Sequence, residues 1–279
     1  MLIARTIEEC VSFRKKLNNS VGLVPTMGSL HEGHIALIKG SLKKCDITIV
    51  SIFLNPKQFS ANEDLDSYPA DDARDIKILK QLNVDCLFMP KQSEIYLEDN
   101  SIDVVENKLS KLLEGNSRPH FFRGVLTIVS KLFNICSPTD VFFGKKDAQQ
   151  LIIVKKLIKD LNYNIKCHEI PIMRSENGLA LSSRNEYFNE SQKEIASNIY
   201  KSLCLVKASI DKGEYNVVAL KKIFSISIQR IPELKIDYFS IADIRTLEEV
   251  VDTISSTVLI STAILLDGVR LIDNIEYVI

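Results

Sequence analysis

Over the first 170 residues, short apolar or β-branched runs alternate with longer amphipathic stretches. The short runs predict strands over residues 21–24, 47–53, 86–89, 141–143 and 166–170. The longer stretches predict helices over residues 35–44, 71–82, 105–113, 125–135 and 148–161. Strands that alternate with helices in this way are typical of βαβ units. We therefore expect an α/β fold with an open parallel sheet in this part of the chain.

The pattern changes after residue 185. Two long amphipathic stretches predict helices over residues 191–212 and 216–230, and three apolar runs predict strands over 237–241, 258–265 and 269–272. We expect a smaller C-terminal α+β domain. The predicted division is a ligand-binding domain over residues 1–174 and a lid domain over residues 175–279, hinged near residues 174–190.

Composition and charge exclude several classes of function. Lys plus Arg number 35 against 36 for Asp plus Glu, so the chain offers no broad positive field for nucleic acid. The N-terminus is acidic where a signal peptide has its apolar core, and residues 258–266 are too few to cross a bilayer. We expect a soluble, cytoplasmic protein with no nucleic-acid or membrane partner. Six widely spaced cysteines are interpreted as reduced core thiols: Cys10, Cys45, Cys86, Cys136, Cys167 and Cys204.

The strongest chemical signal directly follows the first predicted strand. Its sequence is Pro25-Thr26-Met27-Gly28-Ser29-Leu30-His31-Glu32-Gly33-His34. A strand, a glycine turn and a helix start together present free backbone N–H groups that suit a nucleotide phosphate. His31 and His34 share one helix face. The alternatives are an exposed polar first turn or a two-histidine metal pair. No third ligand lies nearby in the sequence, so we predict no protein-bound metal.

Two further segments have phosphate-binding chemistry. In Gly144-Lys145-Lys146-Asp147, glycine allows close backbone approach and lysine supplies a flexible cation; the alternative is a solvated turn with an aspartate cap. Gln150 lies one turn after Lys146 and could bind a hydroxyl or carboxylate. In Ser182-Ser183-Arg184, the arginine fork and the hydroxyls could hold a triphosphate, whereas a helix cap is the alternative.

Other candidates are less specific. The loop Asn55-Pro56-Lys57-Gln58-Phe59 follows a predicted strand, at the sheet edge where α/β proteins bind ligands. His120 lies either in a simple turn before a helix or in a catalytic position. The chain has no Ser-His-Asp or Cys-His pattern and no GxxxxGK[ST] loop. We therefore expect catalysis by positioning and charge, without a covalent enzyme intermediate.

Five motifs in this order resemble the pantothenate synthetase (pantoate–β-alanine ligase) family of the nucleotidyltransferase superfamily with the HxGH motif. They are Pro25-Thr26-Met27-Gly28-x-Leu30-His31-x-Gly33-His34, Ser51-Ile52-Phe53-x-Asn55-Pro56-x-Gln58-Phe59, Phe122-Arg123-Gly124-Val125, Phe143-Gly144-x-Lys146-Asp147-x-Gln149-Gln150 and Gly178-Leu179-Ala180-x-Ser182-Ser183-Arg184-Asn185. The closing Leu271-Ile272-Asp273-Asn274-Ile275 also fits the family. The chain departs from the family pattern at Ala70, Lys145 and His120.

The resemblance implies a Rossmann-like domain and ATP-dependent condensation of (R)-pantoate with β-alanine. The products would be pantothenate, AMP and diphosphate, formed through pantoyl adenylate in the biosynthesis of pantothenate and coenzyme A. ATP would be the co-substrate with Mg²⁺ as its counterion, and Asp75 is the candidate protein ligand for that ion. The resemblance also implies a homodimer.

The resemblance assigns site residues by position. The catalytic set would be His34 as proton donor, His31, Lys146 and Arg184. Pantoate and β-alanine would contact Gln58, Gln150 and Asn55. ATP would contact Met27, Gly28, Ser29, Leu30, His31, Glu32, Gly33, His34, Gly144, Lys145, Lys146, Asp147, Met173, Leu181, Ser182, Ser183 and Arg184.

Two alternatives use the same fold. A related adenylyltransferase acting on a pantetheine or nicotinamide mononucleotide phosphate would need cations for the extra phosphate, whereas Gln58 and Gln150 are neutral. A catalytically silent ATP sensor or scaffold could lose His34 or Lys146, and this chain has both. The ligase is therefore the favoured prediction.

Overall fold

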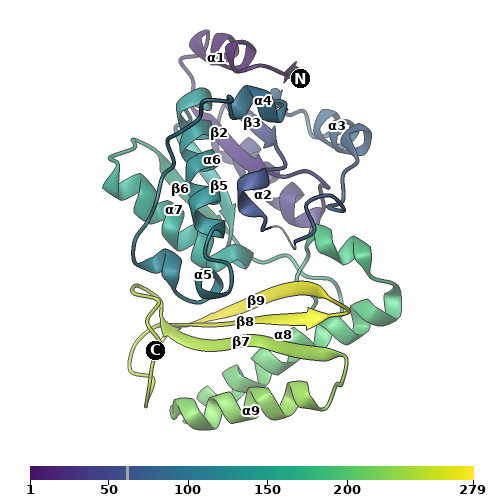
Figure 1. Ribbon diagram of the computed structural model, residues 1–279, viewed down its shortest axis with the longest axis vertical. Helices are drawn as coiled ribbons and strands as arrows, with labels where there is room; N and C mark the ends of the chain where they lie inside the picture. Colours follow the sequence, from purple (N-terminus) through teal and green to yellow (C-terminus); the bar gives the residue numbers. More distant parts are fainter. Residues whose placement is uncertain (61–62) are drawn as a thin grey trace.

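The computed structural model describes residues 1–60 and 63–279, and its N-terminal part contains a six-stranded sheet (Figure 1). The strand order is β1-β4-β3-β2-β5-β6, and every pair of neighbouring strands is parallel. The expected parallel α/β sheet is thus confirmed. Its strands are β1 (Leu2–Ala4), β2 (Val21–Thr26), β3 (Ile47–Ile52), β4 (Cys86–Phe88), β5 (Asp140–Gly144) and β6 (Lys166–Ile170).

Helices cover both faces of this sheet, which explains why its central strands are apolar without alternation. One face packs against α1 (Ile7–Lys15), α6 (Phe121–Cys136) and α7 (Ala148–Asp160). The other face packs against α2 (Glu32–Lys44) and α3 (Asp72–Gln81). Short turns of helix complete this part: η1 (Pro56–Gln58), α4 (Gln92–Ile95), η2 (Leu109–Lys111), α5 (Glu114–Ser117) and η3 (Lys145–Asp147).

The order of the strands fixes where a ligand can bind. From β2 the chain runs outward through β3 to β4, and then returns to place β5 on the other side of β2. At such a reversal the loops that leave two adjacent strands diverge and open a crevice at the carboxyl edge of the sheet. Here those loops are the ones after β2 and β5, which carry His31 and Lys146.

The C-terminal part is a second layered unit with its own core. The strands β7 (Leu234–Asp243), β8 (Val258–Leu266) and β9 (Val269–Tyr277) form an antiparallel sheet. The helices α8 (Glu190–Ile210) and α9 (Val217–Gln229) pack on the face turned away from the N-terminal sheet (Figure 1). The segment η4 (Ser183–Tyr187) connects the two parts. The boundary at residues 174/175 and the movement of the second part as a lid stay predictions.

The secondary structure differs from the sequence predictions at four places. No helix spans residues 105–113, because the Glu106 carboxylate accepts the backbone N–H groups of Lys108 and Ser110 and leaves only the short η2. Strand β1 was not predicted. The helix expected from residue 125 begins at Phe121, and β9 extends five residues beyond the predicted 272, to Tyr277.

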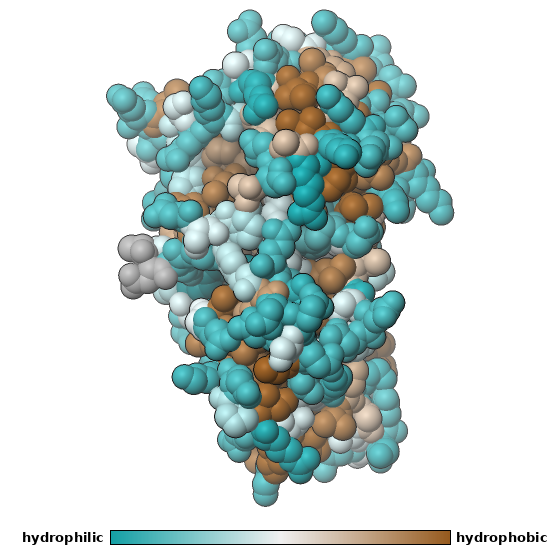
Figure 2. Space-filling view, turned by 90° about the vertical axis from the view of Figure 1, so that its right-hand side faces the viewer, coloured by the Kyte–Doolittle hydropathy of each residue, from teal (hydrophilic) through white to brown (hydrophobic). Residues whose placement is uncertain are grey.

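The surface and the cysteines agree with the composition. On the face seen in Figure 2, hydrophobic side chains form several separate groups between hydrophilic ones. In the described part of the chain, no helix combines the length and the apolar character needed to span a membrane. All six cysteines are free, four of them buried, while Cys167 and Cys204 are partly exposed. The interpretation as core thiols therefore holds for four of the six.

Candidate active site

A cavity of about 990 Å³ opens at the carboxyl edge of the parallel sheet, between the two parts of the molecule. Its walls come from the loops after β2, β3 and β5, from α6, from the segment around η4 and from β7 to β9. Most of the predicted site residues line it: Met27, His31, Gly33, His34, Gln58, Gly144, Lys146, Asp147, Gln150, Met173, Leu181, Ser182, Ser183 and Arg184.

The two histidines form the start of helix α2. His31 is the N-cap, and its Nδ1 accepts the backbone N–H of Gly33 at 3.1 Å. His34 lies at the third helical position, and its Nδ1 accepts the N–H of His31 at 3.4 Å. The His-x-x-His spacing is therefore a capping box made of imidazoles. Gly33 is required because a Cβ there would lie 2.7 Å from the His31 ring.

Burial sets the protonation state of the two rings, and the capping contacts set their tautomer. Burial, assisted by the charge of Lys146, lowers the pKa of His31 to about 4. Burial and the neighbouring His31 hold the pKa of His34 well below its usual value. Both imidazoles are neutral at pH 7, and since each Nδ1 accepts, each proton lies on Nε2. The pair thus offers two uncharged hydrogen-bond donors.

Four backbone N–H groups of this segment are already occupied, so it offers fewer free donors than the sequence predicted. Besides the two amides that the histidines accept, Leu30 donates its N–H to Asp75 Oδ1 at 2.8 Å, and Gly28 donates to Thr26 Oγ1 at 3.3 Å. Asp75, on the first turn of α3, is 1% exposed, and its Oδ2 is buried without a hydrogen-bond partner among the described residues. Burial raises its pKa. Asp75 therefore stabilises the turn through a hydrogen bond to its backbone, and it does not line the cavity.

Gln58 is held by a chain of amide contacts below the cavity floor. The Asn55 Nδ2 group donates to Gln58 Oε1 at 2.9 Å and to the Gly124 carbonyl at 3.1 Å, while Asn55 Oδ1 accepts from the Tyr96 hydroxyl at 2.8 Å. Because the Gly124 carbonyl can only accept, it fixes which way the Asn55 amide points. Gln58 must then turn its carbonyl to Asn55, which leaves its Nε2 as a donor for the cavity. Asn55 itself does not line the cavity.

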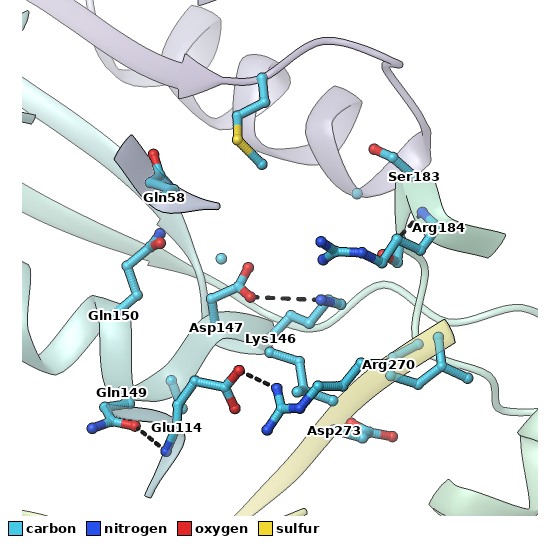
Figure 3. A pocket seen from close by; sticks show the side chains of 18 of the residues that line it. Gln58, Glu114, Lys146, Asp147, Gln149, Gln150, Ser183, Arg184, Arg270 and Asp273 are labelled. Atoms are coloured by element: carbon cyan, nitrogen blue, oxygen red, sulfur yellow. Dashed lines mark hydrogen bonds and ion pairs between the residues drawn. The ribbon is translucent and has the colours of Figure 1, made fainter. Parts of the chain in front are cut away.

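The adjacent glutamines of α7 have different tasks. Gln149 is 7% exposed; its Oε1 accepts the N–H of Glu114 at 3.0 Å, and its Nε2 donates to the carbonyls of Leu109 and Leu112 at 2.8 Å. It therefore anchors the chain before α5. Gln150 makes no side-chain hydrogen bond with residues 1–60 or 63–279, and it lines the cavity beside Gln58 (Figure 3).

The adjacent lysines also diverge. Lys145 turns away from the cavity and pairs with Glu276 at 2.9 Å and Glu169 at 3.5 Å. Lys146 lines the cavity, and the carboxylate nearest to it among the described residues is that of Asp147, with 3.6 Å between Nζ and Oδ1. Lys146 is therefore the cation that can meet a phosphate without first breaking a close ion pair.

The third predicted segment enters the cavity from the opposite side (Figure 3). Ser182 accepts from the Arg184 N–H at 3.3 Å as the cap of η4, and Ser183 donates to the Ser29 carbonyl at 3.2 Å. The Arg184 guanidinium donates to both oxygens of Asp64, at 2.7 and 2.9 Å. Although burial opposes it, this contact lowers the pKa of Asp64. Arg184 thus reaches the cavity already paired.

Five predicted ATP contacts lie outside the lining: Gly28, Ser29, Leu30, Glu32 and Lys145. Leu30 is completely buried in the core, and His120 is exposed and away from the cavity. Conversely, sequence reasoning missed two ion-paired arginines in the lining. Arg118 pairs with Glu63, and Arg270 of β9 pairs with Glu114 (Figure 3). Their partners are 55 and 156 residues away in the chain, and no local pattern signals such pairs.

The cavity lies at the switch point of a parallel sheet, and two neutral histidines at a helix start and a lysine after the neighbouring strand face it. These features define a nucleotide-binding α/β enzyme. The sequence model of the Pantoate-beta-alanine ligase family matches residues 2–276. The chain is 45% identical over 277 residues to the pantothenate synthetase of Thermosipho africanus, covering 98% of this chain and 99% of that protein.

Solved structures agree with the sequence comparison. The pantothenate synthetase of Thermus thermophilus matches with a TM-score of 0.93 and 35% identity, over 99% of both chains. The pantoate-beta-alanine ligase of Francisella tularensis, solved with a β,γ ATP compound and β-alanine, matches with a TM-score of 0.82 and 36% identity, over 99% of this chain and 97% of that one. The chain belongs to the pantoate-beta-alanine ligase family.

Proposed function

We propose that this chain condenses (R)-pantoate with β-alanine at the expense of ATP, giving pantothenate, AMP and diphosphate. The observation that carries the proposal is the division of the cavity: Gln58 and Gln150 lie at one end, Ser183 and Arg184 at the other, and Lys146 between them (Figure 3). Neutral amides suit a small hydroxy acid, and cations with hydroxyls suit a triphosphate. Membership of the ligase family supports the same reaction.

The first step would form pantoyl adenylate. A carboxylate oxygen of pantoate attacks the α-phosphorus of ATP, the bond from that phosphorus to the bridging oxygen of the β-phosphate breaks, and diphosphate leaves. Lys146 and Arg184 balance the negative charge on the phosphate oxygens. His31 and His34 donate hydrogen bonds from their neutral Nε2 groups. Such contacts act by preorganised charge and position, which suits a site without a covalent nucleophile.

The second step would form the amide. The β-alanine nitrogen attacks the acyl carbon of pantoyl adenylate, the bond from that carbon to the AMP oxygen breaks, and the nitrogen loses a proton. Gln58, held through Asn55, would orient the acyl group for this attack. The intermediate would stay in the cavity between the two steps, which protects it from water.

Magnesium would enter as part of the MgATP substrate. Across residues 1–60 and 63–279, no group of three or more His, Cys, Asp or Glu side chains is arranged to hold a metal ion. Mg²⁺ usually keeps several waters and takes phosphates as ligands, so a protein cage is not needed. Asp75 does not fit as its ligand, because one carboxylate oxygen accepts from the backbone and the residue lies outside the cavity lining.

The function is tested by AMP release from ATP with pantoate and β-alanine, repeated with each acid omitted. AMP that requires both acids and appears with an equal amount of pantothenate supports the ligase. Release of diphosphate without AMP, and only with nicotinamide mononucleotide or phosphopantetheine in place of the acids, would favour an adenylyltransferase. Folded protein that binds ATP but releases no AMP would favour a sensor.

The roles of individual side chains are tested by His34→Ala and Lys146→Ala. Each should lower the adenylation rate on the order of a hundredfold with the fold intact. Lys145→Ala is the matched control, because the Lys145 side chain pairs with Glu276 away from the cavity and only its backbone lies near the nucleotide end. A rate close to wild type for Lys146→Ala, or an equal loss for Lys145→Ala, would contradict the assignment.

We also propose that the protein is a cytoplasmic homodimer. The proposal rests on the resemblance of the sequence to the family and on the absence of a membrane-spanning helix in the described part of the chain. Sedimentation equilibrium at micromolar concentration tests it, and a mass equal to one chain of 31.5 kDa would overturn it.

A further inference from the structure

Two adjacent residues of the last strand, Asp273 and Asn274, line the cavity and have no role in the proposal above. They are 4% and 7% exposed. Strand β9 forms one edge of the C-terminal sheet and is the strand of that sheet nearest to the N-terminal part (Figure 1). Because successive side chains of a strand point to opposite faces, the two residues can hold different segments of the molecule.

Asn274 holds the turn that carries Lys146. Its Nδ2 group donates to the backbone carbonyls of Lys145 at 3.0 Å and Lys146 at 2.8 Å, which uses both amide hydrogens. This turn is η3, and no side chain caps its start at Gly144. A side chain of the C-terminal sheet, 128 residues away, therefore fixes the backbone from which Lys146 enters the cavity.

Asp273 holds the segment on the Ser182–Arg184 side of the cavity. Its carboxylate accepts two bonds from the Arg174 guanidinium, at 2.6 and 2.8 Å. Arg174 also donates to the Gly178 carbonyl at 3.1 Å and lies 3.5 Å over the Tyr200 ring. An isolated bridge joins Arg174 to Ala180, two residues before Ser182. Asp273 is thus connected to the segment that leads into η4.

We infer that β9 sets the position of Lys146 relative to the Ser182–Arg184 side, and that Asn274 is a positioning residue for adenylation that acts through Lys146. The inference rests on the proposed function. Lys146 stabilises charge as the bond between the α-phosphorus and the leaving diphosphate breaks, and such stabilisation falls steeply when a donor is displaced by about 1 Å. Loss of the two Asn274 bonds frees the η3 backbone to make that displacement.

The test is a double-mutant cycle between Asn274→Ala and Lys146→Ala. Pantoate-dependent exchange of labelled diphosphate into ATP reports adenylation alone. We expect Asn274→Ala to lower the exchange rate about tenfold when Lys146 is present, and by less than about twofold in the Lys146→Ala background. Equal losses in both backgrounds, or no loss with Lys146 present, would overturn the inference, because a purely structural role acts on both alike.

Two further variants keep the test decisive. Asn274→Ser, which retains a shorter donor, replaces Asn274→Ala if that protein fails to fold. Asn216→Ala is the matched control: Asn216 caps α9 by accepting the Ala219 N–H at 2.9 Å, so its loss weakens the same C-terminal part without touching η3. It should lower the thermal midpoint while keeping the exchange rate within twofold of wild type. A tenfold loss of rate in Asn216→Ala would instead assign the effect to general destabilisation.

Failure of the proposed function has a separate signature. Wild-type protein without pantoate-dependent exchange would refute that function, and the inference is then judged from ATP affinity measured by calorimetry. Asn274→Ala should weaken ATP binding when Lys146 is present and leave it unchanged in the Lys146→Ala background. Equal weakening in both backgrounds, or none in either, would refute the inference.

Discussion

Because His31 is held in its neutral form in the folded protein, the stability of the protein should fall in acid. The substitution His31→Asn should reduce this loss of stability. An asparagine at the N-cap can still accept the Gly33 N–H that His31 Nδ1 accepts at 3.1 Å, so the helix start keeps its cap. Asparagine does not titrate. The substitution therefore removes the ionisable group and leaves the local structure in place.

The magnitude follows from the pKa of His31, which burial lowers from 6.5 to about 4. Between these two values the unfolded chain binds a proton that the folded chain excludes, so acid favours unfolding. The folded protein loses no stability through His31 well above pH 6.5, and it loses stability progressively as the pH falls from 6.5 towards 4. At pH 5 the loss from His31 alone is about 2 kcal/mol relative to pH 7.5.

Urea unfolding at pH 7.5 and pH 5.0 measures this effect. The other titrating groups are the same in both proteins. The free energy of unfolding of the wild type should fall by about 2 kcal/mol more than that of His31→Asn, and the two proteins should be similar at pH 7.5. Equal losses on acidification, or a larger loss in the variant, would refute the neutral burial of His31.

Three substitutions test the rest of the site. Gly124→Ala places a Cβ 2.2 Å from the Lys57 carbonyl oxygen, and this clash must displace η1 together with Gln58. The value of kcat/KM for pantoate should fall on the order of a hundredfold while ATP affinity is unchanged, and wild-type kinetics would contradict this. In Gly144→Ala, the added Cβ lies no closer than 3.9 Å to any atom other than those of residues 143–145. The free energy of unfolding should therefore change by less than about 0.5 kcal/mol, while KM for ATP rises. An unchanged KM would remove Gly144 from the ATP contacts. Gln149→Leu should lower the free energy of unfolding by about 2 kcal/mol, because it removes three hydrogen bonds to the backbone. Gln150→Leu should only raise KM for pantoate. The reverse outcome in denaturation and kinetics would refute the different roles of the two glutamines.

The parallel sheet and the main site residues could be predicted because their signals are local. The buried run of β3 and the strand–turn–helix order around His31 and His34 are read within about ten residues. Gln150 was predicted from its spacing of one turn after Lys146, and it lies in α7 directly after η3, which holds Lys146.

The remaining features depend on contacts that sequence spacing does not encode. The turn before α2 was expected to offer free amides, and several of them are occupied by side chains, one of which is Asp75, 45 residues beyond Leu30. Arg184 was predicted as a phosphate clamp, and its partner Asp64 lies 120 residues earlier. The segment after Val105 was read as a helix because its apolar spacing fits one, and the backbone contacts of the Glu106 carboxylate outweigh that pattern.

The pairing of the arginines in the cavity has a consequence for the kinetics of nucleotide capture. Arg118, Arg184 and Arg270 each carry a carboxylate partner, so the site has little net charge before ATP arrives, and the whole chain has a formal charge of −1. Without a long-range field to steer an anion, encounter depends on diffusion and concentration. We expect the association rate constant for MgATP, measured by stopped flow, to vary less than about threefold between 20 and 200 mM salt.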